Sequence, residues 1–97
     1  MSDRTFQVYI LTNTRKTVLY TGVTGNLEKR IQQHKTGKPR GFTSRYNVDR
    51  LVFFEEYERP DEAIMREKQI KAGSRQKKID LINSLNPEWK DLSEDWE

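Results

Sequence analysis

The sequence predicts a single α+β domain, in which a small three-stranded antiparallel sheet is flanked by helices in the order β-β-α-β-α-α. Three observations support this fold class: short β-branched and aromatic segments, residues typical of helix ends, and a short connection between the first two segments. With 97 residues, of which 33% are apolar, the chain can form one modest core. We expect this domain to span residues 5–92. A short acidic tail over residues 93–97 follows it, and we expect the chain to be mobile from Asp91 onward.

Three segments show the alternation or the β-branched and aromatic content of strands, namely residues 6–11, 17–23 and 51–57. The first two are separated by a short polar stretch, so the simplest pairing is an antiparallel hairpin. Helix-capping residues predict three helices. The first runs from the N-cap Asn26 to about Thr36, the second from Pro60 to Gly73, and the third from the cap Ser74 to about Leu85.

Composition excludes several classes of site. The chain has no cysteine, which rules out disulfide scaffolds, cysteine-ligated zinc and a thiol nucleophile. His34 is the single histidine, which argues against zinc sites that need two or three. The apolar runs are far too short for a membrane span or a signal-peptide core, so we expect a cytoplasmic protein without membrane contact.

The net charge of +3 is unevenly distributed along the chain. Residues 1–50 hold ten Lys/Arg and three Asp/Glu, giving +7, whereas residues 51–97 hold eight and twelve, giving −4. A basic half indicates a polyanionic partner, although ordinary solvated charge explains it equally well.

Polar residues interrupt the predicted apolar helix faces. In the first helix, Arg30 and His34 lie one turn apart and flank Leu27 and Ile31. In the second helix, Glu67 lies near the centre of an apolar face, where a carboxylate needs a cation. That cation is either Arg30, in a structural ion pair without chemistry, or a metal ion.

Two strand tyrosines and one glycine complete the unusual set. Tyr9 and Tyr20 fall on adjacent predicted strands, where they either pack as ordinary strand residues or direct both hydroxyls into one cleft. Gly22 ends the second strand and would let a backbone or a phosphate approach closely.

Together these residues resemble the GIY-YIG nuclease superfamily, and in particular its short single-domain bacterial members. Gln7-Val8-Tyr9 stands at the first motif and Tyr20-Thr21-Gly22 at the second. Arg30 and His34 follow on a helix, and Glu67 lies within Arg66-Glu-Lys-Gln-Ile70. The resemblance covers roughly residues 5–92. It departs from the family name at Gln7, Val8 and Thr21, which leaves the reactive side chains in place. The asparagine that supports the site in some members corresponds to either Asn83 or Asn86.

The resemblance implies a metal-dependent endonuclease with five catalytic residues: Tyr9, Tyr20, Arg30, His34 and Glu67. Glu67 would hold one Mg²⁺ or Mn²⁺ ion per site. Arg30 would meet the phosphate, and Tyr20 would orient water or phosphate. Tyr9 would be the general base, with its pKa lowered by Arg30 or the metal, and His34 would accept the Tyr9 proton or bind phosphate. Asp61 and Glu62 lie off the Glu67 face, which argues against a two-metal site.

The implied partner is nucleic acid, most simply DNA, in repair or in the processing of unusual DNA structures. Besides Gly22, we expect phosphate and base contacts from the basic loop, through Lys35, Lys38, Arg40, Phe42, Arg45 and Tyr46. A homodimer or a partner protein would supply specificity. Two other functions stay open: a non-catalytic nucleic-acid-binding module of the same fold, and a protein-interaction domain using the acidic half with Trp89 and Trp96.

Overall fold

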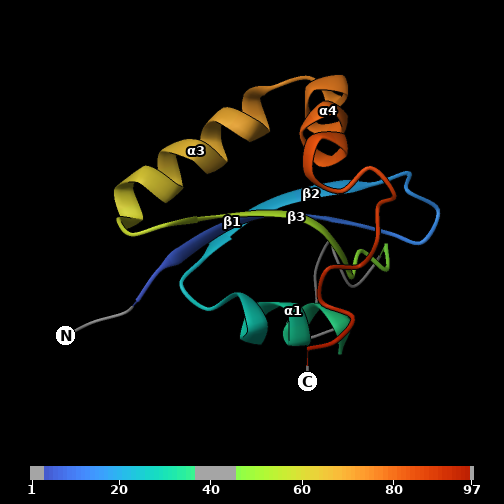
Figure 1. Ribbon diagram of the computed structural model, residues 1–97, viewed down its shortest axis with the longest axis horizontal. Helices are drawn as coiled ribbons and strands as arrows, with labels where there is room; N and C mark the ends of the chain where they lie inside the picture. Colours follow the sequence, from blue (N-terminus) through green and yellow to red (C-terminus); the bar gives the residue numbers. More distant parts are fainter. Residues whose placement is uncertain (1–3, 37–45, 97) are drawn as a thin grey trace.

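The computed structural model describes residues 4–36 and 46–96 of the chain. Within these ranges it forms β1 (Phe6–Thr12), β2 (Leu19–Thr24), α1 (Leu27–Lys35), β3 (Arg50–Tyr57), α3 (Pro60–Ala72) and α4 (Arg75–Leu85). The order confirms the predicted β-β-α-β-α-α arrangement (Figure 1).

The strands form one antiparallel sheet with the order β2-β1-β3, so β1 is central and β2 is an edge strand. Tyr9 in β1 pairs with Gly22 in β2 and with Phe54 in β3. A register shift between Ile10 and Leu11 interrupts the pairing with β3. This register places Tyr9 one strand away from the β2 edge.

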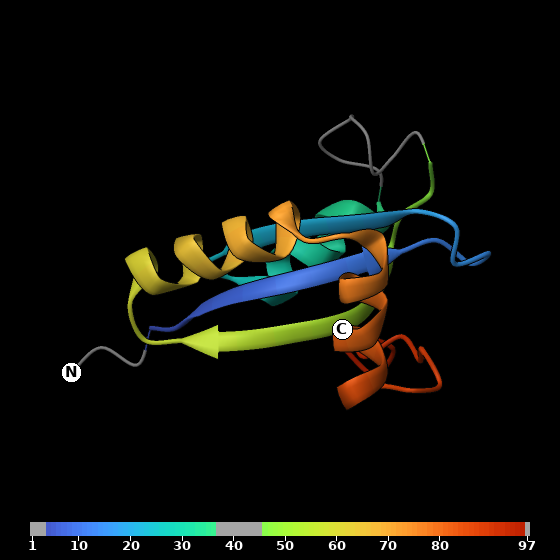
Figure 2. The same ribbon diagram turned by 90° about the horizontal axis from the view of Figure 1, so that it is seen from above.

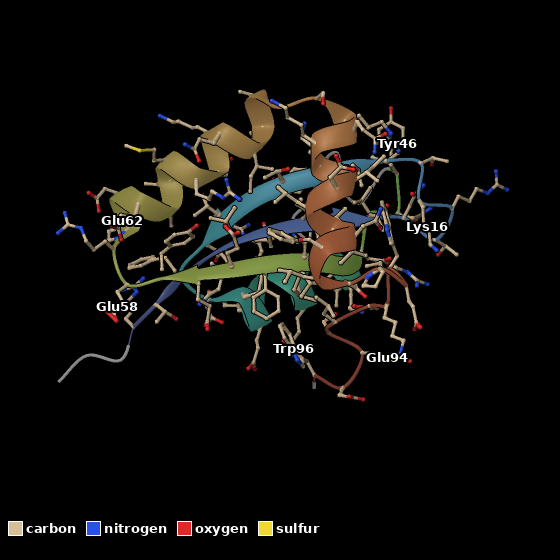
Figure 3. The ribbon with its side chains drawn as sticks, turned by 45° about the horizontal axis from the view of Figure 1, so that its top comes forward. Lys16, Tyr46, Glu58, Glu62, Glu94 and Trp96 are labelled. Carbon is tan, nitrogen blue, oxygen red and sulfur yellow. The ribbon has the colours of Figure 1, made fainter. Side chains whose placement is uncertain are left out.

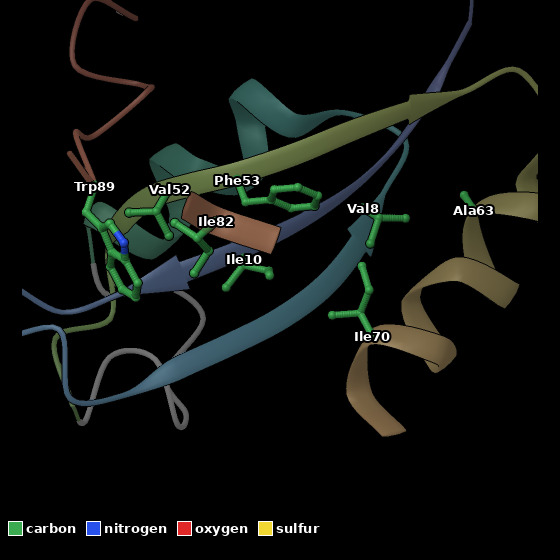
Figure 4. Packing of buried hydrophobic residues seen from close by; sticks show 8 residues of the cluster. All are labelled: Val8, Ile10, Val52, Phe53, Ala63, Ile70, Ile82 and Trp89. Carbon is green, nitrogen blue, oxygen red and sulfur yellow. The ribbon is translucent and has the colours of Figure 1, made fainter. Parts of the chain in front are cut away.

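Helices cover both faces of the sheet, with α3 and α4 on one face and α1 on the other (Figures 1 and 2). Strand side chains alternate between the two faces, and each set is buried against a different helix layer. The layer under α3 and α4 contains Val8, Ile10, Val52, Phe53, Ala63, Ile70, Ile82 and Trp89 (Figure 4). The layer over α1 contains Tyr9, Leu11, Leu27, Ile31, Val48 and Leu51.

The three predicted helices begin as expected, two with a side-chain cap and one with a proline. The Asn26 side chain accepts a hydrogen bond from the Lys29 backbone N–H at 3.1 Å, and Ser74 Oγ accepts one from Lys77 at 3.1 Å. Helix α3 begins with Pro60 and has no side-chain cap. Gly73 ends α3 as predicted. Its φ is −76°, so this helix end does not depend on the left-handed conformation that glycine favours.

The C-terminal segment corrects the expectation of a mobile tail from Asp91. Asp91 Oδ1 accepts hydrogen bonds from the Leu51 backbone N–H at 3.2 Å and from Ser93 Oγ at 2.6 Å, and the Leu92 N–H donates to the Leu51 carbonyl at 2.7 Å. Trp96 packs edge-on against Phe54, and Figure 3 shows it on the side of the sheet that carries α1. These long-range partners order the acidic segment, and its composition does not reveal them.

The two candidate asparagines and Trp89 also belong to this region. Asn86 is buried and donates to the carbonyls of Val52 and Lys90. Asn83 accepts a hydrogen bond from the Trp89 indole N–H at 2.7 Å. Both asparagines therefore hold the chain after α4, and Trp89 packs into the core layer under α3 and α4. None of the helices in residues 4–36 and 46–96 is long and apolar enough to cross a membrane.

Candidate active site

The candidate site is centred on Tyr9 in β1 and on its pairing partner Gly22 in the edge strand β2. Tyr9 is 2% exposed. A Cβ added to Gly22 would lie 2.5 Å from the Tyr9 hydroxyl oxygen and 2.6 Å from its Cζ. The missing side chain at Gly22 therefore makes room for the Tyr9 ring. This corrects the expectation that the space serves the approach of a backbone or a phosphate.

Three aromatic rings from three elements gather there. The ring centroid of Tyr9 lies 6.4 Å from that of Tyr20 and 6.2 Å from that of His34, and the Tyr20 and His34 centroids are 5.7 Å apart. The Tyr9 hydroxyl is 3.5 Å from His34 Nε2. Strands β1 and β2 thus place both tyrosines against the last turn of α1.

The surroundings keep Tyr9 and His34 neutral near pH 7. Burial raises the pKa of the Tyr9 phenol, and the nearby Tyr20 and Glu67 add to this, whereas Arg30 lowers it without reversing the direction. Burial also lowers the pKa of His34, and the positive charge of Arg30 lowers it further. Of the two cations expected to lower the Tyr9 pKa, Arg30 acts in the expected direction but is outweighed by burial, and the contribution of a metal ion stays a prediction.

Arg30 lies on α1 one turn before His34, at a half-buried position. It lines a hollow of about 210 Å³ together with Thr24, Asn26, Lys29 and Gln33. Two larger hollows, of about 380 and 440 Å³, are lined by none of the five catalytic candidates. Of the five catalytic candidates, the smaller hollow is lined by Arg30 alone, and its donors are suited to an anion.

Glu67 approaches the same edge from the opposite face of the sheet. It lies on the buried side of α3 with Ala63 and Ile70, and only 9% of the residue is exposed. Its Oε2 is 2.7 Å from the Lys71 Nζ, and this hydrogen bond raises the pKa of Lys71. A pair with Arg30, one of the two alternatives that the sequence left open, is not among the ion pairs of residues 4–36 and 46–96, where the i,i+4 lysine on the same helix pairs with Glu67.

The carboxylate of Glu67 fits a single hard divalent cation. Mg²⁺ and Mn²⁺ are held by one or two carboxylates and complete their shells with water and phosphate oxygens. In the part of the chain that the structure describes, no three His, Cys, Asp or Glu side chains gather at one place. Asp61 is engaged with Arg59 at 3.0 Å, and Glu62 lies at the exposed start of α3 (Figure 3). Glu67 is therefore the candidate ligand, with Lys71 as its present partner.

The residues expected to contact the substrate are only partly placed. The Lys35 ammonium is held by Asp91 at 2.7 Å, so it supports the C-terminal segment and is not directed into the cleft. Tyr46 is 45% exposed. Lys38, Arg40, Phe42 and Arg45 lie outside the described residues. Sequence reasoning missed Lys71, although its spacing of four residues from Glu67 on a predicted helix was a usable signal.

Comparison with known proteins identifies the family. A family model described as the GIY-YIG catalytic domain matches residues 5–80. A UPF0213 protein of Clostridium perfringens is 44% identical over 77 residues, which cover 79% of this chain and 82% of the relative. A UPF0213 protein of Syntrophus aciditrophicus is 44% identical over 85 residues, which cover 84% of this chain and 92% of the relative.

A solved structure agrees with this result. The solution NMR structure of the UPF0213 protein BH0048 from Bacillus halodurans matches with a TM-score of 0.58 and 30% identity, covering 90% of this chain and 92% of that one. The names of these relatives state no activity. The family model, by contrast, covers all five predicted catalytic residues. The chain belongs to the GIY-YIG family of nuclease domains.

Proposed function

We propose that this protein is a metal-dependent endonuclease that hydrolyses phosphodiester bonds in DNA. The observation that carries the proposal is the meeting of Tyr9, Tyr20 and His34 at the β2 edge, with Arg30 and Glu67 close enough to influence the Tyr9 pKa. Family membership supports nucleic acid as the substrate class. The choice of DNA, the metal and the mechanism are part of the proposal.

Phosphodiester hydrolysis needs a base for the attacking water, relief of charge at phosphorus and stabilisation of the leaving oxygen. Tyr9 takes the proton from water and passes its own proton to neutral His34, whose Nε2 faces the Tyr9 hydroxyl at 3.5 Å. Tyr20 orients the water or the phosphate. Arg30 pairs with the phosphate, because its planar guanidinium matches two phosphate oxygens.

Glu67 would hold one Mg²⁺ or Mn²⁺ ion. When bound, the ion supplies Lewis-acid stabilisation of the phosphate and of the leaving oxygen. The raised pKa of Tyr9 gives a reason for a cation in this site, since an added positive charge near the phenol favours its ionised form. A homodimer or a partner protein would extend the contact area, because a domain of this size offers little surface for specificity.

A second candidate is a non-catalytic nucleic-acid-binding module with the same fold. The pairing of Glu67 with Lys71 favours it, because a permanent ion pair would leave the carboxylate without a metal-binding role. Arg30 and its hollow would then bind phosphate without chemistry.

Cleavage of a labelled panel of single-stranded, duplex and branched DNA and of RNA, with Mg²⁺ or with EDTA, tests the proposal. We expect cleavage that needs Mg²⁺ and is lost in Glu67→Gln and Arg30→Ala. Asp61→Asn is the matched control, since it removes a carboxylate of the same helix that pairs only at the surface with Arg59. Binding of the panel without cleavage in any condition would favour the binding module.

A further inference from the structure

Lys71 and Glu67 form an ion pair whose two partners have very different environments. Only 11% of the Glu67 side chain is exposed, whereas 55% of the Lys71 side chain is. Ion pairs with i,i+4 spacing are common on helices and are usually surface features. This pair differs because its carboxylate is directed toward the sheet, near Tyr9, where a negative charge needs a cation.

We propose that Lys71 is a resident cation that neutralises Glu67 in the metal-free protein, gives way to the divalent ion, and then offers its ammonium to the substrate phosphate. This inference rests on the proposed function, because it assigns a positioning role to a residue of the same site. It adds a residue that neither the predicted catalytic set nor the predicted substrate contacts contain.

Competition follows from the geometry of the pair. The Lys71 Nζ lies 2.7 Å from Oε2, so it occupies one of the two oxygens that a metal would use. A lysine ammonium is a point charge on a flexible stem, and this stem is half exposed, so it can leave without disturbing the core. Lys71 therefore lowers the affinity of the empty site for metal.

Lys71 is within electrostatic range of the aromatic group of the candidate site. Lys71 is close enough to Tyr20 for the two groups to interact electrostatically. Once the metal has displaced the ammonium from Glu67, a phosphate at the Tyr20 side of the site would bind it and so oppose its return to the carboxylate. Metal and nucleic acid then bind with positive coupling, which by linkage must be reciprocal.

Binding of Mn²⁺ to the DNA-free protein, followed by isothermal titration calorimetry, tests the competition. We expect Lys71→Met to bind Mn²⁺ about five-fold more tightly than wild type, the order of effect for one partner of an ion pair. Lys68→Met is the matched control, because Lys68 is an exposed lysine of α3 with no ion pair to Glu67 in the structure, and it should bind like wild type. Equal or weaker binding by Lys71→Met would overturn the proposal.

Glu67→Gln separates this inference from the proposed function. We expect it to abolish Mn²⁺ binding. If Glu67→Gln binds like wild type, Glu67 is not the ligand and the proposed metal site itself fails. If Glu67→Gln loses binding while Lys71→Met is unchanged, the metal site stands and only the role of Lys71 is wrong.

The release of Lys71 to phosphate is tested by the salt dependence of binding to a labelled DNA oligonucleotide. In Ca²⁺, Lys71→Met should reduce the slope of log K against log salt by about one, because one phosphate contact is lost. In EDTA the slope should stay as in wild type, because Glu67 then holds the ammonium. Equal slope changes in both conditions would show that metal does not release Lys71.

Discussion

At the scale of single residues, the position of Gly22 in β2 has no space for a side chain. Its added Cβ would lie within 2.6 Å of two Tyr9 atoms, and Tyr9 is buried too deeply to move aside. We expect Gly22→Ala to displace the Tyr9 ring, to destabilise the fold by about 1–3 kcal/mol, and to abolish cleavage. Urea unfolding and the cleavage assay measure the two effects.

Gly25→Ala is the control for this prediction. The Cβ at Gly25 would lie 3.0 Å from an Arg4 guanidinium nitrogen, and Arg4 is exposed. Its flexible end can shift at little cost, so stability and cleavage should change little. Equal losses in the two variants would mean that any side chain in this part of the chain is harmful, and the steric argument for Gly22 would fail.

His34 links stability to pH. Burial and Arg30 lower the pKa of His34 in the folded protein. The unfolded chain therefore takes up a proton first as pH falls below the ordinary histidine value of about 6.5. More protons are then bound in the unfolded state, so the free energy of unfolding should decrease as pH falls from about 7 to 5. His34→Gln should reduce this decrease. If urea unfolding gives the same loss of unfolding free energy between pH 7 and 5 for both proteins, the prediction is contradicted.

At the scale of elements, hydrogen bonds to the Asp91 carboxylate hold the segment after α4 against β3. Burial alone would raise the pKa of Asp91, but hydrogen bonds from Lys35, Ser93 and the Leu51 backbone outweigh it, and the pKa is lowered. Asp91→Asn keeps the shape but removes the charge, so we expect a loss of about 1–3 kcal/mol in unfolding free energy. Thermal or urea unfolding measures the loss.

Glu94→Gln is the control for the Asp91 variant, since Glu94 is exposed and lies in the same segment. It should unfold like wild type. Because a lowered carboxylate pKa contributes stability that disappears as pH falls through the folded value, wild type and Asp91→Asn should converge in stability at acidic pH. A constant difference at all pH values would rule out the charge as the cause.

The elements themselves were largely predictable, because each depends on local signals. Strand alternation, Asn26, Pro60 and Ser74 are read from a few neighbouring residues, and the structure places their elements as predicted. Asp91 could not be interpreted in this way, because the hydrogen-bond donor at Leu51 lies 40 positions away in the chain. Charge composition indicated a mobile tail, and tertiary contacts overrode it.

The candidate site was also predictable where it depends on local motifs and unpredictable where it depends on tertiary contacts. Tyr9, Tyr20 and His34 could be assigned from motif spacing, and the structure brings their rings together. The partner of Glu67 could not be assigned from the sequence, because it depends on which cation reaches the β2 edge. Arg30 lies on α1 and Glu67 on α3, on opposite faces of the sheet, so the near neighbour Lys71 pairs with the carboxylate.

At the scale of the whole molecule, cations from the two halves of the chain line different hollows. Arg30 belongs to the basic half and lines the hollow beside the site. Lys77 belongs to the acidic half and lines a different hollow, between α3 and α4, together with Asp80. Position relative to the β2 edge, and not the overall charge of the molecule, should therefore decide which cations bind DNA.

Salt titrations of oligonucleotide binding in EDTA distinguish these two accounts. Wild-type affinity should fall steeply with salt as counterions are released. Arg30→Ala should reduce the slope of log K against log salt by about one, whereas Lys77→Ala should leave it unchanged. If both variants reduce the slope equally, binding follows overall charge and the proposed cleft is not the footprint. Unchanged slopes in both would mean that nucleic acid contacts another surface.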